Sequence, residues 1–400
     1  MSAKLALHGG KAAVPTQIKP YNSIDASDAQ IVNDFMARVV SGHLVLSGYL
    51  AGNLYGGLAV QTLENRFKSA FGVADAIACN SATSGLYAAY AACRDGTRRV
   101  LYCPPLTMAA TATAAHMLDY TLAFYDVDET GGGNPQEVPH SGTDPVVITS
   151  LWGHPADINR VRVTHPHGRL IQDCAQSLWA NANGRIDGVD ADIAVYSFNV
   201  HKHVQCGEGG VVVVPRDTAL ARRIRRLINH GEVGDELMPG LNLRMTELTA
   251  VLAISQFDKS EKAVRSREKL AYALMELIPE PFKPIMPRTG CRSSWYLLPF
   301  LLPSTAMRTF AVSALEAERV PCLQGYSPLL NEMRTFKVDG NRECPRASDL
   351  EKRLLLIEMC SIDPTDEQLE QMGQGFRKVA EYLEGSYDSG GEPRAESAVV

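Results

Sequence analysis

Seven short apolar or β-branched runs between residues 76 and 214 constrain the fold of this chain more than any other feature. Several of them, such as 210–214, are apolar throughout and do not alternate with polar residues, which is typical of strands covered on both faces of a sheet. Stretches of helical character lie between most of them. The alternation predicts an α/β fold with a seven-stranded, mainly parallel sheet between helices. The runs are 76–79, 99–103, 122–126, 146–149, 169–172, 193–197 and 210–214.

The pattern changes after residue 214. A basic helix is expected over 218–229, and apolar residues at helical spacing over 245–257 predict a further helix. The charge-rich segment 258–269 is expected to begin a long connecting helix. We therefore predict an N-terminal arm (1–25), a large domain (26–262), a smaller C-terminal α+β domain (263–385) and a disordered tail (386–400). The helices expected between the strands are 83–93, 107–118, 156–163 and 175–181.

Composition excludes several classes of protein. Net charge is −6, whereas a nucleic-acid-binding protein would carry a basic surplus. The longest uncharged stretches contain Gly, Asn or Pro, so we expect no membrane span. The nine cysteines form no CxxC pair, which favours free thiols in a reducing compartment such as the cytoplasm. His165/His167 and His201/His203 lack the further ligands of a metal site, so none is expected.

Ligands of open α/β sheets bind at the carboxyl ends of the strands, so the residues that follow each run are the candidates for chemistry. Residues 80–85 (NSATSG) follow the first run and open a helix. Small residues at a helix N-terminus suit a phosphate group, although an ordinary helix cap has the same composition. Asp173 follows the fifth run. A carboxylate buried there needs a cationic partner, and the alternative is that it caps the next helix.

Lys202 lies between the end of the sixth run and a glycine-rich return, 207–210. A lysine that is partly removed from water there would have a lowered pKa and would be nucleophilic, whereas most lysines after a strand are simply solvated. Its neighbours His201 and His203 could add charge repulsion or could line the surface. A phosphate site, a buried acid and a nucleophilic lysine together are what pyridoxal phosphate requires.

In this order, the residues resemble the DegT/DnrJ/EryC1/StrS family of sugar aminotransferases, which depend on pyridoxal 5′-phosphate (PLP) and have the fold-type-I architecture. The resemblance runs from about Gly48 to Leu383. Its most specific part is the SFxxxKxxxxGEGG spacing of residues 197–210, which is kept without a gap. The other matching segments are 72–86, 104–111, 153–157, 173–176 (DCAQ) and 240–247.

The resemblance implies a role for each matching residue. Lys202 would form the Schiff base with the cofactor and act as the catalytic base. Asp173 would pair with the pyridine nitrogen, and Gln176 would lie near the ring hydroxyl. The family also contains dehydratases that have His in place of the lysine, and Lys202 argues against that branch.

The same resemblance places the cofactor's phosphate and its ring. Asn242 would reach the phosphate from the partner subunit, which implies a homodimer with shared active sites. Met108 occupies the position where the family commonly has an aromatic residue stacked on the ring, and a thioether can also pack on that face. The remaining phosphate contacts would come from Ala82, Thr83 and Ser197.

The expected reaction is transfer of an amino group from glutamate or glutamine to a nucleotide-linked keto sugar, in antibiotic or surface-polysaccharide biosynthesis. Three alternatives stay open. Segments 5–10 and 320–326 are similar to members that act on cyclitol ketones such as scyllo-inosose or that make aminohydroxybenzoate. A PLP lyase, dehydratase or aromatising synthase would have the same fold. The third alternative is a non-catalytic regulatory or partner subunit. The presence of Asp173 and Lys202 argues against it.

Overall fold

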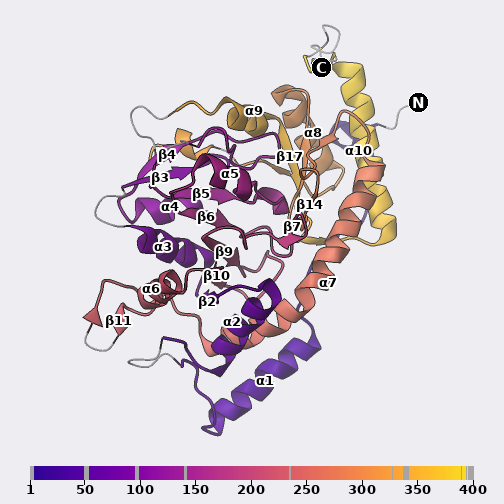
Figure 1. Cartoon of the computed structure of the whole chain (residues 1–400). Helices are drawn as coiled ribbons and strands as arrows, with labels where there is room; N and C mark the ends of the chain where they lie inside the picture. The colour runs from indigo at the N-terminus through magenta and orange to yellow at the C-terminus, as the bar shows by residue number, and fades with distance from the viewer. Residues whose placement is uncertain are drawn as a thin grey trace.

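The computed structural model describes residues 4–48, 54–94, 99–138, 142–233, 236–326, 328–336, 342–388, 390–392 and 394. All seven predicted runs form one sheet, and the α/β prediction is confirmed (Figure 1). The strands lie in the order β2-β10-β9-β6-β5-β3-β4, and only β10 runs antiparallel to its neighbours. Their bounds are β2 Asp75–Cys79, β3 Val100–Cys103, β4 Thr121–Phe124, β5 Val146–Thr149, β6 Leu170–Asp173, β9 Ile193–Ser197 and β10 Gly210–Val214.

Helices cover both faces of this sheet, which explains why β10 is apolar throughout. Val211 and Val213 pack in one cluster with α2 and α7, and Val212 and Val214 pack in another cluster with α3 and α6. Each valine of the strand therefore loses contact with water. The helices of this part are α1 Ala26–Val40, α2 Leu58–Phe71, α3 Ala82–Cys93, α4 Ala109–His116, α5 Ile158–Thr164, α6 Thr218–Ile228 and α7 Glu247–Leu277.

One helix prediction is wrong. Residues 175–180 form turns and not a helix, because tertiary contacts hold this segment: the indole Nε1 of Trp179 donates to the hydroxyl of Ser260 at 2.6 Å, and the Trp179 ring stacks on Phe257. The chain then enters the short strands β7 (Asn181–Ala182) and β8 (Arg185–Ile186). The helices predicted over 245–257 and from 258 onward are confirmed, and they are continuous: α7 begins at Glu247 and no Gly or Pro interrupts it.

A second hydrophobic core lies in the C-terminal part, around a four-stranded antiparallel sheet in the order β13-β15-β17-β16. Its strands are β13 Lys283–Pro284, β15 Leu298–Leu301, β16 Leu323–Gln324 and β17 Leu354–Ile357. Its helices are α8 Thr305–Ala317, α9 Pro345–Arg353 and α10 Asp366–Ser386. The remaining short elements are η1 Ala6–His8, β1 Lys19–Pro20, β11 Glu232–Val233, β12 Glu236–Leu237, β14 Cys291–Arg292, η2 Leu151–Gly153, η3 Leu330–Glu332 and β18 Ile362–Asp363.

The N-terminal arm packs against this second core. Leu5, Val14 and Ile18 are buried in it, and β1 pairs with β18. We keep as a proposal the division into an arm (1–25), a large domain (26–262) and a small domain (263–385), whose boundary falls within α7. Of the proposed tail 386–400, residues 389, 393 and 395–400 lie outside the described residues. The backbone N–H of Arg394 donates to the carbonyl of Ser386 at 2.9 Å.

Candidate active site

A cavity of about 380 Å³ lies at the carboxyl ends of β6 and β9 and at the N-terminus of α3. Its position agrees with the rule for ligand sites in open α/β sheets. Seven of the eight residues predicted for the site line it: Ala82, Thr83, Met108, Asp173, Gln176, Ser197 and Lys202.

The N-terminus of α3 forms one end of the cavity. Ser81 caps the helix, and its hydroxyl accepts a hydrogen bond from the backbone N–H of Ser84 at 3.1 Å. Ala82 and Thr83 line the cavity at the first helical turn, where backbone N–H groups lack intrahelical partners. A Cβ on Gly210 would lie 2.8 Å from the Ala82 nitrogen, so glycine is required for β10 to approach this turn. The segment is thus both a helix cap and a site suited to an anion.

Asp173 is the last residue of β6 and is 5% exposed. Its carboxylate accepts hydrogen bonds from the Thr111 hydroxyl at 2.8 Å and the Ala175 backbone N–H at 3.1 Å. Burial raises the pKa of Asp173, and the two hydrogen bonds and the charge of Lys202 oppose that rise. The alternative that Asp173 caps a helix is wrong, because turns follow it.

Lys202 is 9% exposed, and its ammonium nitrogen lies 4.0 Å from the centroid of the Tyr296 ring. Burial lowers the pKa of Lys202 to about 8, and the opposite charge of Asp173 limits the fall. His203 is buried, and burial lowers its pKa to about 4, so it is neutral near pH 7 and adds no charge repulsion. His201 is exposed and lines the cavity.

Gln176 is held at both ends of its side-chain amide. Its Oε1 accepts from the backbone N–H of Trp152 at 2.7 Å, and its Nε2 donates to the hydroxyl of Tyr326 at 2.5 Å. A backbone N–H can only donate, so these contacts fix which end of the amide is the oxygen.

Met108 and Asn242 lie at the edge of the site or outside it. Met108 precedes α4 and is 57% exposed, although it lines the cavity. Asn242 is exposed and does not line the cavity of its own chain, and its backbone forms an isolated bridge with Asn229. Asn242 is the one predicted site residue that the structure leaves apart from the others.

Several residues of the site were not predicted, and three of them, Thr111, Tyr296 and Tyr326, contact predicted residues directly. Thr111, the hydrogen-bond partner of Asp173, lies inside the motif 104–111 and could have been found there. Tyr296, in the cavity wall, and Tyr326, the partner of Gln176, come from the C-terminal part of the chain. Tyr296 lies in no segment singled out from the sequence. Tyr326 ends the segment 320–326, whose resemblance bears on the acceptor and not on a contact with Gln176.

The chemistry of these residues fits PLP. A helix N-terminus suits the phosphate, a buried carboxylate suits the pyridine nitrogen, and a buried amine of lowered pKa suits the aldehyde carbon. Within the parts of the chain that the structure describes, no three His, Cys, Asp or Glu side chains are grouped so that they could bind a metal ion. The described helices include none with the length and hydropathy that crossing a bilayer requires.

Comparison with known proteins agrees with this chemistry. A curated relative from Acidithiobacillus ferrooxidans, a UDP-N-acetyl-3-dehydro-α-D-glucosamine 3-aminotransferase, is 27% identical over 330 residues, which are 80% of this chain and 88% of the relative. The solved structure of DesI with its TDP-sugar product is 26% identical, has a TM-score of 0.79 and covers 95% of this chain and 97% of its own.

A Streptococcus pneumoniae protein solved in its PLP form shares the fold at 17% identity, with a TM-score of 0.80 and coverage of 92% and 99%. Residues 47–376 match the sequence model of the DegT/DnrJ/EryC1/StrS aminotransferase family. The chain therefore belongs to the DegT/DnrJ/EryC1/StrS family and is a PLP-dependent aminotransferase.

Proposed function

We propose that this aminotransferase transfers an amino group from glutamate or glutamine to the ketone of a nucleotide-linked sugar, in antibiotic or surface-polysaccharide biosynthesis. The observation that carries the proposal is that Lys202 and Asp173 line one cavity with the N-terminus of α3. The acceptor is supported by two names: the Acidithiobacillus relative is named for a UDP-linked dehydro sugar, and DesI was solved with a TDP-sugar.

Lys202 is proposed to carry the cofactor and to move the proton during the reaction. When bound, PLP supplies an electron sink that stabilises the carbanion at the donor's Cα. A pKa of about 8 leaves a useful fraction of the Lys202 amine neutral near neutral pH, so it can accept a proton from carbon and return it. Burial keeps water away from this exchange.

Asp173 is proposed to hold the positive charge of the cofactor's pyridine nitrogen. Its side chain is fixed by Thr111 and Ala175, so it does not have to reorganise when the cofactor binds. Because the carboxylate is buried, a cation beside it offsets the cost of its desolvation. Ala82, Thr83 and Ser197 are proposed to bind the phosphate, Gln176 the ring oxygen and Met108 the ring face.

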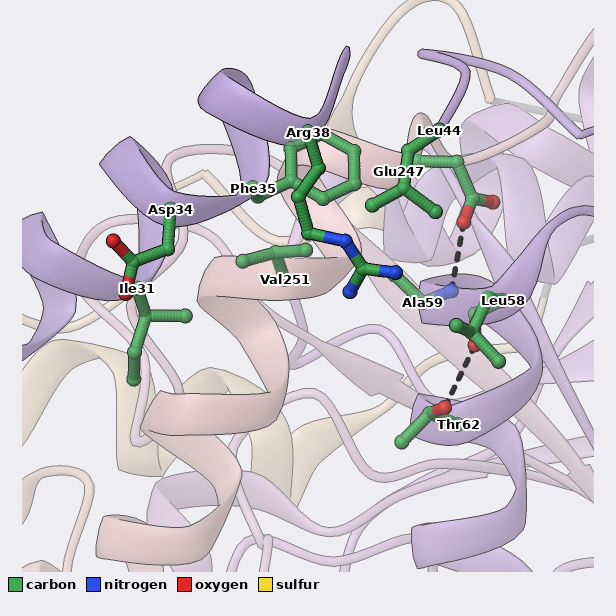
Figure 2. A pocket seen from close by; sticks show the side chains of 10 residues that line it. All are labelled: Ile31, Asp34, Phe35, Arg38, Leu44, Leu58, Ala59, Thr62, Glu247 and Val251. Atoms are coloured by element: carbon green, nitrogen blue, oxygen red, sulfur yellow. Dashed lines mark hydrogen bonds between the residues drawn. The ribbon is translucent and has the colours of Figure 1, made fainter. Parts of the chain in front are cut away.

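We propose a homodimer in which Asn242 reaches the phosphate of the partner's site. Asn242 is exposed and lies apart from the cavity of its own chain. A groove of about 300 Å³ between α1, α2 and the start of α7 is lined by exposed apolar residues, Ile31 (41%) and Leu58 (64%), and by the charged Asp34 and Arg38 (Figure 2). Such a face suits a second copy of the chain. All nine cysteines are free thiols, which supports a cytoplasmic location.

The two half-reactions test the function separately. In the first, the purified yellow enzyme should turn colourless with glutamate or glutamine and release the matching 2-oxo acid. Colour loss without 2-oxo acid would favour a lyase or dehydratase. In the second, the aminated enzyme should regain its colour with UDP- or TDP-linked keto sugars, and mass spectrometry should find the amino sugar. Preference for scyllo-inosose would favour the cyclitol alternative, and Lys202→Ala should be inactive in both half-reactions.

A further inference from the structure

Among the residues that the structure describes, only one of the two Nε2 hydrogens of the Gln176 side chain has a protein partner. Oε1 accepts from Trp152 N–H at 2.7 Å, and one Nε2 hydrogen goes to the Tyr326 hydroxyl at 2.5 Å. The amide carries two donors on Nε2, so the second remains. Gln176 lines the cavity, where a bound cofactor would meet that donor.

Both contacts of the amide are themselves firmly held. Trp152 is fully buried and has a φ of 62°, in the left-handed region that non-glycine residues rarely adopt. Its segment is tied to the C-terminal part through Ser294 N–H to the Gly153 carbonyl at 3.0 Å and Leu297 N–H to the Trp152 carbonyl at 3.2 Å. The strained backbone thus presents its N–H to Gln176 in a fixed place.

Tyr326 reaches the site from the loop that follows β16. Leu329 and Leu330, just beyond it, are buried in the core of the sheet, and the Leu330 N–H donates to the carbonyl of Pro105 at 3.1 Å. Tyr326 is 150 residues from Gln176 in sequence. The loop is therefore anchored beside the cofactor cavity by contacts that do not involve the tyrosine hydroxyl.

We propose that Tyr326 is a positioning residue: by accepting one hydrogen of Gln176, it directs the other hydrogen of that amide to the ring oxygen of the cofactor. The proposal rests on the assignment of Gln176 to the cofactor site. Without the tyrosine oxygen, the amide loses its second fixed end and the donor turns away from the cofactor for part of the time. Tyr326 thereby acts on the cofactor through Gln176.

The expected signature is spectroscopic. The colour of bound PLP changes with pH as it loses the proton shared between its ring oxygen and the Lys202 nitrogen. A donor to that oxygen favours its charged form and lowers the pH midpoint of the change. Tyr326→Phe should therefore raise the midpoint by roughly 0.5–1 pH unit, and weaken PLP binding to the apo protein about threefold to tenfold.

The other titratable groups around the site do not produce this shift. Burial raises the pKa of Tyr326 to about 12, with Asp173 and Glu358 adding to the rise, so the tyrosine stays protonated over the range studied. Asp173, Glu358 and Cys360 also act on Lys202, and Tyr326→Phe leaves all three in place.

A double-variant cycle on the holoenzyme tests the proposal. Tyr326→Phe should shift the midpoint in the parent protein but not in the Gln176→Ala background. Gln176→Glu can accept from both Trp152 and Tyr326 but offers no hydrogen to the cofactor, so it should raise the midpoint at least as much while keeping the thermal unfolding temperature. Tyr382→Phe, whose ring stacks on Phe310, is the matched control and should change neither value.

Three results would overturn the proposal: an unchanged midpoint in Tyr326→Phe, an equal shift in the Gln176→Ala background, or a parent-like midpoint in Gln176→Glu. A parent-like midpoint in Gln176→Glu would overturn the proposal even if Tyr326→Phe folds poorly, because it would show that Gln176 gives no hydrogen to the cofactor. Failure of the parent protein to bind PLP would instead refute the proposed function, so the two failures are distinguishable.

Discussion

The ammonium nitrogen of Lys202 lies 4.0 Å from the ring centroid of Tyr296, on a segment that leads into the C-terminal sheet. A cation over an aromatic face is stabilised by roughly 0.5–2 kcal/mol. The same segment is tied to the large sheet by Ser294, whose hydroxyl donates to the Gln176 carbonyl at 3.0 Å. The place of the reactive amine therefore depends on residues from both cores of the protein.

Borohydride treatment of the yellow enzyme should fix a pyridoxyl group on Lys202, because this amine is buried in the cavity with a lowered pKa. Peptide mapping by mass spectrometry checks the site. Lys202→Ala should lose turnover yet keep measurable PLP affinity, since the α3 end of the cavity survives. Lys262 is exposed, so Lys262→Ala is the control and should keep the turnover and the PLP affinity of the parent. An adduct mapped to another lysine would refute the assignment.

The reactivity of Lys202 in the apo protein should rise through about pH 8, since only the neutral amine is a nucleophile. Exposed lysines should become reactive only near their ordinary pKa of about 10.4. Asp173 raises the pKa of Lys202 by its charge, so Asp173→Asn should move the Lys202 midpoint to lower pH. Pulsed labelling with an amine-reactive reagent at a series of pH values measures the Lys202 midpoint in the parent protein and in Asp173→Asn. A midpoint that rises in Asp173→Asn would contradict the coupling.

Asp173→Asn should reduce turnover by at least about 100-fold, because it removes a fixed charge from the site of charge development. The amide can still accept from Thr111, so the fold and bound cofactor should largely survive. Thr111→Val keeps the carboxylate of Asp173, so it should reduce turnover much less than Asp173→Asn does. Steady-state rates with circular dichroism controls check this. Near-parent turnover in Asp173→Asn would mean that the pyridine partner lies elsewhere.

Mixed subunits should reveal the shared site. Lys202→Ala and Asn242→Ala homodimers should each be inactive or nearly so. After subunit exchange, a heterodimer has one site with both residues intact, so activity should partly return. Native mass spectrometry confirms that exchange occurred. If exchanged heterodimers stay inactive, Asn242 does not serve the partner's site.

Met108→Phe should tighten PLP binding by about threefold to tenfold, because an aromatic face stacks better on the cofactor ring than a half-exposed thioether. Met108→Ala should weaken binding. Fluorescence titration of the apo protein gives both values. Weaker binding in Met108→Phe would show that the cavity is shaped around the thioether.

The sequence allowed the large sheet to be predicted because its signal is local. A run such as 210–214 is apolar at every position, since α2 and α3 cover its two faces. Asp173 and Lys202 could be found because they follow such runs. The helix predicted over 175–181 does not form, because Trp179 in this segment donates a hydrogen bond to Ser260, 81 residues away. Tyr326 lies in the segment 320–326 singled out above, but its contact with Gln176 could not be predicted, because the two residues are 150 positions apart.

Helix α7 is continuous over 31 residues and is roughly 45 Å long at 1.5 Å per residue. Figure 1 shows it passing from α1 and α2 at one end to α10 at the other. The N-terminal segment makes a second connection: Leu5 packs in the C-terminal core, and Ser23 N–H donates to the side-chain oxygen of Gln205, between β9 and β10, at 3.1 Å. Two such tethers in parallel oppose bending. Because α7 and the arm both join the two cores, they help to keep Tyr296 and Tyr326 in place beside the site.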